Sequence, residues 1–207
     1  TAEYLATNGK KVTVVEMLPR ILPAEDPEIS NLARKAFARQ GIAIHTDTRV
    51  DRLVKEADSV TAHLVKPGGQ AETVQARRVI LAIGIAGNVE GLGLEQQGVK
   101  IEKGHIAIDE WCRTGAPGIY AIGDVAGPPW LAHKASHEGG LCVEKITGVA
   151  GVHPLDRTAI PSCTYSAPQV ASVGLTEEAA RAAGHEVKIG RFPYSANGKA
   201  IALGETE

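Results

Sequence analysis

The feature that most constrains the fold is a short apolar run between glycines, Gly118-Ile-Tyr-Ala-Ile-Gly-Asp-Val125. Such a run is typical of a buried strand in a parallel sheet covered on both faces, where ligands gather at the carboxyl ends of the strands. Asp124 stands at that end, and its carboxylate can accept hydrogen bonds from sugar or polyol hydroxyls. Gly123 removes a side chain that would keep a ligand from the backbone. The alternative is a strand-end aspartate that only faces water.

A helix is predicted directly after this run, between Trp130 and Gly148. Small or apolar residues recur there at the three-and-four spacing of a packed helix face, namely Ala132, Ala135, Gly139, Val143 and Ile146. The helix would begin a few residues after Asp124. Unsatisfied amides at a helix start favour anionic or electron-rich groups. The Asp124 carboxylate and the helix start together therefore predict one ligand site.

The run GIYAIGDV, followed after five residues by LAHKASHEG, resembles the second flavin-contacting segment of the pyridine nucleotide-disulfide oxidoreductases. The LAHKA…EG form is similar to the dihydrolipoamide dehydrogenase branch in particular. The resemblance implies FAD as a cofactor, contacted by Asp124 and by the helix start at Trp130, Leu131, Ala132 and His133. At His133 it favours a backbone contact with the flavin over chemistry of the imidazole.

The N-terminal residues predict part of a dinucleotide-binding unit. Residues 1–9 are typical of the second half of a helix that ends at Gly9, and residues 11–16 of a strand ending in Glu16. In a βαβ unit an acidic residue about 20 positions after the first loop glycine binds the ribose hydroxyls. Counting back places that glycine loop upstream of Thr1, so we expect a portion of a longer enzyme. A carboxylate at Glu16 would repel a 2′-phosphate and so favours NAD over NADP, the alternative being an exposed strand-end glutamate.

The following segments predict an α/β fold with a parallel sheet, helices and a β-meander. Pro27 to Gln40 is amphipathic, and short strands are expected at residues 42–45, 49–55 and 59–66, with a central strand at residues 78–84. The resemblance places Val50 and Gly84 in the NAD cleft, where a small residue at Gly84 lets the dinucleotide lie against the backbone. The family usually has Arg-x-Pro-Asn after AIG, and here Ile85 and Gly87 depart from that pattern.

Three domains are expected from these segments. They are an NAD-binding domain at residues 1–86, a central or second FAD-binding segment at residues 87–153, and part of an interface domain at residues 154–207. The third contains predicted strands at residues 169–174 and 186–192 around a capped helix at residues 176–184, which is an α+β pattern. The resemblance implies that this domain forms a homodimer.

Composition narrows the class of protein. The 207 residues carry a net charge of −2 and are 4% aromatic, which argues against a nucleic-acid surface. No apolar run has the roughly 20 residues of a membrane span, and no signal peptide pattern opens the sequence, so we expect a cytoplasmic protein, or a matrix protein in a eukaryote. Cys112, Cys142 and Cys163 form no CxxC or metal pattern and are expected to be reduced thiols without a catalytic role.

The resemblance implies a flavin-dependent dihydrolipoyl dehydrogenase. Electrons would pass from dihydrolipoamide through a disulfide and FAD to NAD, and the lipoyl-bearing acyltransferase of 2-oxo acid dehydrogenase complexes would be a partner. No catalytic residue is expected in this chain, because the family's redox cysteines and its His-Glu pair have no counterpart in it. Two alternatives stay open, another FAD- and NAD-linked disulfide reductase and a non-catalytic nucleotide-binding module.

Overall fold

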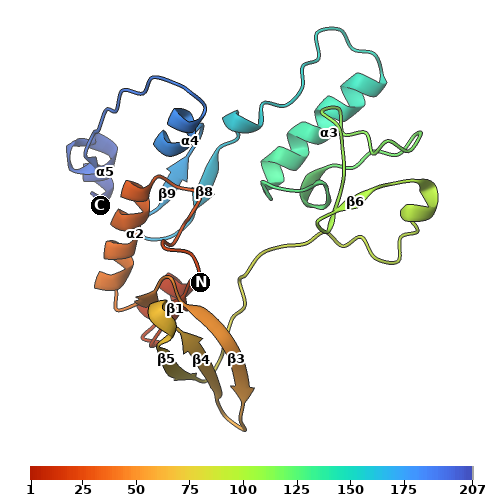
Figure 1. Cartoon of the computed structure of the whole chain (residues 1–207). Helices are drawn as coiled ribbons and strands as arrows, with labels where there is room; N and C mark the ends of the chain where they lie inside the picture. Colours follow the sequence, from red (N-terminus) through yellow and green to blue (C-terminus); the bar gives the residue numbers. More distant parts are fainter. Residues whose placement is uncertain (207) are drawn as a thin grey trace. The chain divides into compact units, whose positions relative to one another are not determined.

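The computed structural model of the chain describes residues 1–206 (Figure 1). These residues divide into two compact units. The second unit consists of residues 81–160, and the first unit contains the described residues on either side of it. Each unit is described separately below.

The first unit begins with a parallel strand pair and two helices. The elements in chain order are α1 (Ala2–Thr7), β1 (Thr13–Val15), α2 (Pro27–Arg39) and β2 (Ala43–His45). β1 and β2 are parallel, with Thr13 opposite Ala43. Proline at the first position of α2 costs no hydrogen bond, since that N–H has no partner inside a helix. The expected helix and strands are therefore confirmed in this part of the chain.

An antiparallel meander follows the parallel pair. It is formed by β3 (Arg49–Lys55), β4 (Val60–Val65) and β5 (Ala71–Ala76), in that order. β4 and β5 are joined by a single 3-10 turn, η1 (Pro67–Gly69), where Gly68 has a φ of 77° that favours glycine. Leu64 on the central strand is almost fully buried. The meander confirms the hairpin expected at residues 49–66 and adds a third strand.

The C-terminal part of the first unit is a small α+β assembly. It contains β8 (Ser162–Thr164), antiparallel to β9 (Val170–Ser172), then α4 (Glu177–Ala182), the 3-10 turn η5 (Tyr194–Ala196) and α5 (Gly198–Leu203). The Thr176 side chain caps α4 by accepting from the Ala179 N–H. Figure 1 shows α2 beside these strands, and the Ser172 hydroxyl donates to Glu25 at 3.2 Å.

The second unit contains one long helix and short strands. Its elements are η2 (Glu95–Gln97), β6 (Ile101–Glu102), β7 (His105–Ile106), η3 (Gly123–Ala126), α3 (Ala132–Ile146) and η4 (Arg157–Ala159). β6 and β7 form a hairpin. The buried core consists of Val89, Val99, Ile106, Ala116, Ala121 and Ala126. This core lies directly under η3, the turn that carries Asp124.

Three expected strands are wrong. Residues 78–84 form no strand, and Ile83 in that segment is 92% exposed. Residues 119–122 make only one isolated bridge, between Tyr120 and Arg113, and residues 186–192 have no regular structure. An apolar run becomes a strand only when a neighbouring strand completes its hydrogen bonds, and the described residues provide no such neighbour for these segments.

Candidate functional site: the Asp124 turn and the start of helix α3

Asp124 lies on a tight turn at the surface of the second unit. Gly123 is buried with a φ of 76°, and a Cβ added to it would lie 3.2 Å from the Cβ of Ala135 on α3. Both the conformation and the close approach to the helix therefore require glycine. The Asp124 side chain is exposed, and its carboxylate has no hydrogen-bond or ion-pair partner among the described residues. The Asp124 carboxylate is therefore available as an acceptor, and its contact with a ligand remains a prediction.

A buried ion pair holds this turn against α3. The Lys134 and Glu138 side chains, one helical turn apart, are 0% and 2% exposed, with Nζ and Oε1 3.3 Å apart. Lys134 Nζ also donates to the Gly123 and Gly127 carbonyl oxygens at 3.2 and 2.7 Å. Glu138 Oε2 accepts from the Gly123 N–H at 2.8 Å. The pair thus satisfies backbone groups at both ends of the turn, which offsets the cost of burying two charges.

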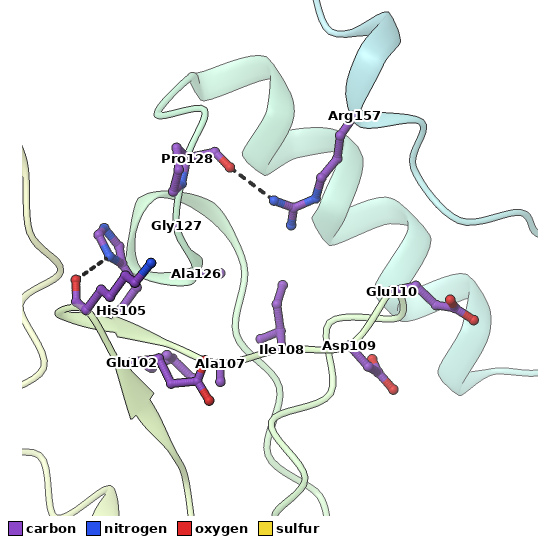
Figure 2. A pocket seen from close by; sticks show the side chains of 12 residues that line it. Glu102, His105, Ala107, Ile108, Asp109, Glu110, Ala126, Gly127, Pro128 and Arg157 are labelled. Atoms are coloured by element: carbon purple, nitrogen blue, oxygen red, sulfur yellow. Dashed lines mark hydrogen bonds between the residues drawn. The ribbon is translucent and has the colours of Figure 1, made fainter. Parts of the chain in front are cut away.

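Arg157 extends this network toward the surface. Its guanidinium lies 3.5 Å from Glu138 Oε1 and donates to the Pro128 carbonyl at 3.0 Å (Figure 2). The Arg157 side chain is half-exposed, so water screens its charge, whereas Lys134 is fully enclosed. Lys134 therefore provides most of the charge compensation for Glu138.

The buried face of α3 differs from the one that the sequence predicted. Val143 and Ile146 are more than half exposed, and Ala132 is exposed. The buried residues of the helix are instead Lys134, Glu138, Leu141 and Cys142. The apolar spacing failed as a guide because two charged residues occupy the face that packs on the turn, where backbone carbonyls and an N–H satisfy them.

Helix α3 begins without a side-chain cap. Leu131 is the N-cap residue with extended backbone, and no side chain caps the helix. The backbone of Ala132 and His133 follows in the first turn, and both residues are exposed. Uncapped N–H groups at a helix start bind anionic or electron-rich atoms. The Lys134–Glu138 pair of the same helix holds the Asp124 turn through Gly123 and Gly127, and the shared binding site remains a prediction.

Trp130 lies just before this helix start and contacts the β6–β7 hairpin. Its indole N–H donates to His105 Nε2 at 3.2 Å, and the two rings stack with centroids 5.8 Å apart. Trp130 is half-buried.

The cysteines of the second unit are buried thiols. Burial, with a smaller contribution from the Glu138 carboxylate, raises the pKa of Cys112 to about 11. Burial also raises the pKa of Cys142, while Cys163 in the first unit is exposed. None of the three forms a disulfide within the described residues. Within residues 1–206, no group of three or more His, Cys, Asp or Glu side chains is arranged to hold a metal ion.

Glu16 and Val50 belong to the first unit. Glu16 follows β1, where its Oε1 accepts from the Leu18 N–H at 2.8 Å, and its backbone is fixed by hydrogen bonds with His45 and Thr48. One carboxylate oxygen is thereby oriented by the turn, and the other is available to a ligand. Val50 on β3 is 43% exposed, which is compatible with an apolar contact surface.

Gly84 belongs to the second unit. It is exposed and has a φ of 131°, a backbone conformation that other residues rarely adopt. No atom lies within 4 Å of a Cβ built on it, so the space next to its backbone is open.

An open cavity of about 420 Å³ lies beside the turn (Figure 2). Its walls come from the β6–β7 hairpin, the segment at residues 107–110, the turn at residues 126–128, and Arg157. None of the residues predicted to bind a cofactor lines this cavity. It therefore adjoins the candidate site without containing it.

The sequence matches two family descriptions in succession. Residues 1–139 match the pyridine nucleotide-disulphide oxidoreductase family, and residues 160–207 match the dimerisation domain of the same family. The chain therefore belongs to the pyridine nucleotide-disulphide oxidoreductases. Members of this family bind FAD and NAD(P).

Two curated relatives that match the chain are both dihydrolipoyl dehydrogenases. The dihydrolipoyl dehydrogenase of Rhizobium etli is 51% identical over 206 residues, and that of Bacillus subtilis is 45% identical over 208 residues. Both alignments cover 100% of this chain but only 43% and 44% of the relative. The chain thus spans less than half the length of the curated relatives that it matches.

Solved structures of flavoenzymes have the same fold. LpdA from Mycobacterium tuberculosis matches with a TM-score of 0.87 at 26% identity, over 99% of this chain and 44% of that one. A copper complex of the HOCl-induced flavoprotein disulfide reductase RclA from Escherichia coli matches with a TM-score of 0.87 at 25% identity, over 100% and 46%. The expected fold class is therefore confirmed, namely Rossmann-like domains followed by the start of a dimerisation domain.

Sequence reasoning missed Lys134 and Glu138, although both lie inside the LAHKASHEG segment. One feature of the sequence could have indicated that these two residues are buried. Lysine and glutamate four residues apart, on a helix next to a glycine-rich turn, can pair with each other and with the turn's carbonyls. Hydrophobic periodicity alone assigns both residues to solvent.

Proposed function

We propose that this chain acts within a dihydrolipoyl dehydrogenase, which transfers electrons from dihydrolipoamide through a disulfide and FAD to NAD. The observation that carries the proposal is the pairing of a free Asp124 carboxylate with the uncapped start of α3. The names of the curated relatives support the same activity.

The residues of the turn fit a flavin. Asp124 offers an acceptor for polyol hydroxyls, and the uncapped start of α3, which includes Ala132 and His133, would offer backbone donors for ring oxygens or nitrogens. Trp130 and Leu131 add apolar surface next to these donors. When bound, FAD supplies the two-electron chemistry that amino-acid side chains lack. The chain's own residues hold and orient it.

The Glu16 turn fits the ribose of NAD. The free carboxylate oxygen of Glu16 can accept a hydroxyl, and its negative charge would oppose a 2′-phosphate. Val50 would pack against the dinucleotide. These features favour NAD over NADP.

The thiols of this chain do not suit electron transfer from dihydrolipoamide. A thiolate is the reactive form of cysteine, and the raised pKa of Cys112 keeps it protonated at neutral pH. We therefore propose that the redox disulfide comes from outside this chain and that the chain contributes no catalytic residue.

The dimerisation domain that matches residues 160–207 indicates a homodimer. We propose a lipoyl-bearing acyltransferase of a 2-oxo acid dehydrogenase complex as a further partner, and a cytoplasmic or matrix location. No helix within residues 1–206 has the length and apolar character needed to cross a membrane. The division into domains at residues 1–86, 87–153 and 154–207 also stays a proposal.

The test is a substrate comparison in the full-length protein. The purified flavoprotein should reduce NAD with dihydrolipoamide and should use NADP far less well. If the protein instead reduced glutathione disulfide or another disulfide efficiently, this would favour another FAD- and NAD-linked disulfide reductase. A protein that binds the nucleotides but turns over none of these substrates would favour the non-catalytic binding module.

A further inference from the structure

The His105 ring packs against the segment that links the Asp124 turn to α3. It stacks on Trp130 with an interplanar angle of 25°, and a Cβ added to Gly127 would lie 4.0 Å from His105 Cγ. His105 is the first residue of β7. The second residue of this strand, Ile106, belongs to the same buried core as Ala126 of η3. The imidazole therefore contacts Trp130 and lies next to Gly127 at the other end of residues 127–130.

The hydrogen bonds of His105 define its protonation. The indole N–H of Trp130 is only a donor, so His105 Nε2 must accept with its lone pair. His105 Nδ1 lies 3.0 Å from the Lys103 carbonyl, which is only an acceptor, so Nδ1 carries the proton (Figure 2). Both ring nitrogens are used, and the arrangement requires the neutral imidazole.

We propose that His105 is a positioning residue for flavin binding, which acts by fixing Trp130 at the start of α3. The Lys134–Glu138 pair holds the turn from the buried side, and His105 holds the same segment from the hairpin side. The inference rests on the proposed function, because it assigns a role to a residue that does not itself contact the flavin.

Acid should release this contact, since an imidazolium has no lone pair with which to accept from Trp130. The charged groups around the ring are Glu102 opposite it in the hairpin, Lys103 beside it, Asp124 on η3, and Asp109, Glu110 and Arg157, which line the adjoining cavity. These groups include both positive and negative charges. No single one of them replaces the hydrogen bond from Trp130 that protonation of His105 removes.

The experiment measures the FAD dissociation constant of the full-length apoenzyme. His105→Phe keeps an aromatic ring without the acceptor, and Trp130→Phe keeps a ring without the donor. Each should weaken FAD binding about five- to tenfold, the range for one hydrogen bond near 1 kcal/mol. The double variant should be no weaker than either single one, because both remove the same contact.

Two further readouts separate this role from simple packing. His105→Gln restores an acceptor near Nε2 and should recover most of the affinity. The affinity ratio of wild type to His105→Phe should fall toward one in acid, because a protonated His105 cannot accept from Trp130. Trp111→Phe is the matched control, because Trp111 packs under Lys145 at 4.0 Å and not on this segment.

Additive losses, an unaffected His105→Phe variant, or a His105→Gln variant as weak as His105→Phe would each overturn the role of His105 while FAD binding itself remains. A wild-type protein that takes up no FAD would instead overturn the proposed function.

Discussion

Two turns of this molecule present a carboxylate, and they are built differently. Glu16 stands on a turn that backbone hydrogen bonds hold together, with its own Oε1 closing the turn through Leu18. Asp124 stands on a turn whose carbonyls and N–H are held by a buried ion pair from another element, α3. The Glu16 turn is thus locally determined, whereas the Asp124 turn depends on side chains 10 to 14 positions away in sequence.

The largest effect is expected when the buried Lys134–Glu138 ion pair that holds the Asp124 turn is broken. Lys134→Met leaves the Glu138 carboxylate buried without its main counter-charge, which should cost about 3 to 5 kcal/mol of local stability. Cys112 reports the opening, because its thiol lies 3.8 Å from the Glu138 carbonyl. Cys112 is slow to alkylate in the wild type, since it is buried and its pKa is raised to about 11, so thiolate forms only as the pH rises toward that value. The variant should alkylate faster at neutral pH by a hundredfold or more, as about 1.4 kcal/mol corresponds to a factor of ten.

A matched double variant sharpens this result. Lys134→Met combined with Glu138→Leu removes both charges and should recover part of the stability, because an apolar pair avoids the buried charge. The Gly123 N–H still loses its acceptor, so recovery should be incomplete by about 1 to 3 kcal/mol. Equal labelling rates in wild type and Lys134→Met would show that the ion pair does not hold the turn.

The second prediction concerns the Glu16 turn. Glu16→Ala in the full-length enzyme should raise the KM for NAD roughly tenfold or more, given about 1.5 to 3 kcal/mol for a hydrogen bond to a charged group. A basic replacement at the same position should improve the use of NADP. Glu16→Gln is the control, because it keeps acceptor oxygen but removes charge. Unchanged NAD kinetics in Glu16→Ala would remove Glu16 from the cofactor site.

The smallest effect is expected at the rim of the buried network. Arg157→Gln removes a half-exposed partner 3.5 Å from Glu138, and such a pair contributes at most about 1 kcal/mol. The alkylation rate of Cys112 should therefore change less than about tenfold. If Arg157→Gln opened the turn as much as Lys134→Met, charge compensation would come from the rim and not from the buried pair.

The contrast between the two turns also explains which parts of the structure can be predicted from the sequence and which cannot. The Glu16 strand, the meander and the position of Asp124 depend on local periodicity and glycine placement, so the sequence predicts them. Lys134 and Glu138 were missed because their burial depends on carbonyls of a distant turn, which no helical pattern records. Residues 78–84 and 119–122 were predicted as strands because their composition favours burial, but hydrogen-bonded partners define a strand and composition does not supply them.

The central claim is that the Asp124 turn binds FAD, and an affinity measurement tests it most directly. FAD would be titrated into the full-length apoenzyme as wild type, Asp124→Ala and Asp58→Ala, where Asp58 is an exposed aspartate in the β3–β4 turn. Asp124→Ala should weaken FAD binding about tenfold or more, since a hydroxyl loses a charged acceptor worth about 1.5 to 3 kcal/mol. Asp58→Ala should bind as the wild type does. Equal FAD affinity in wild type and Asp124→Ala would contradict the account.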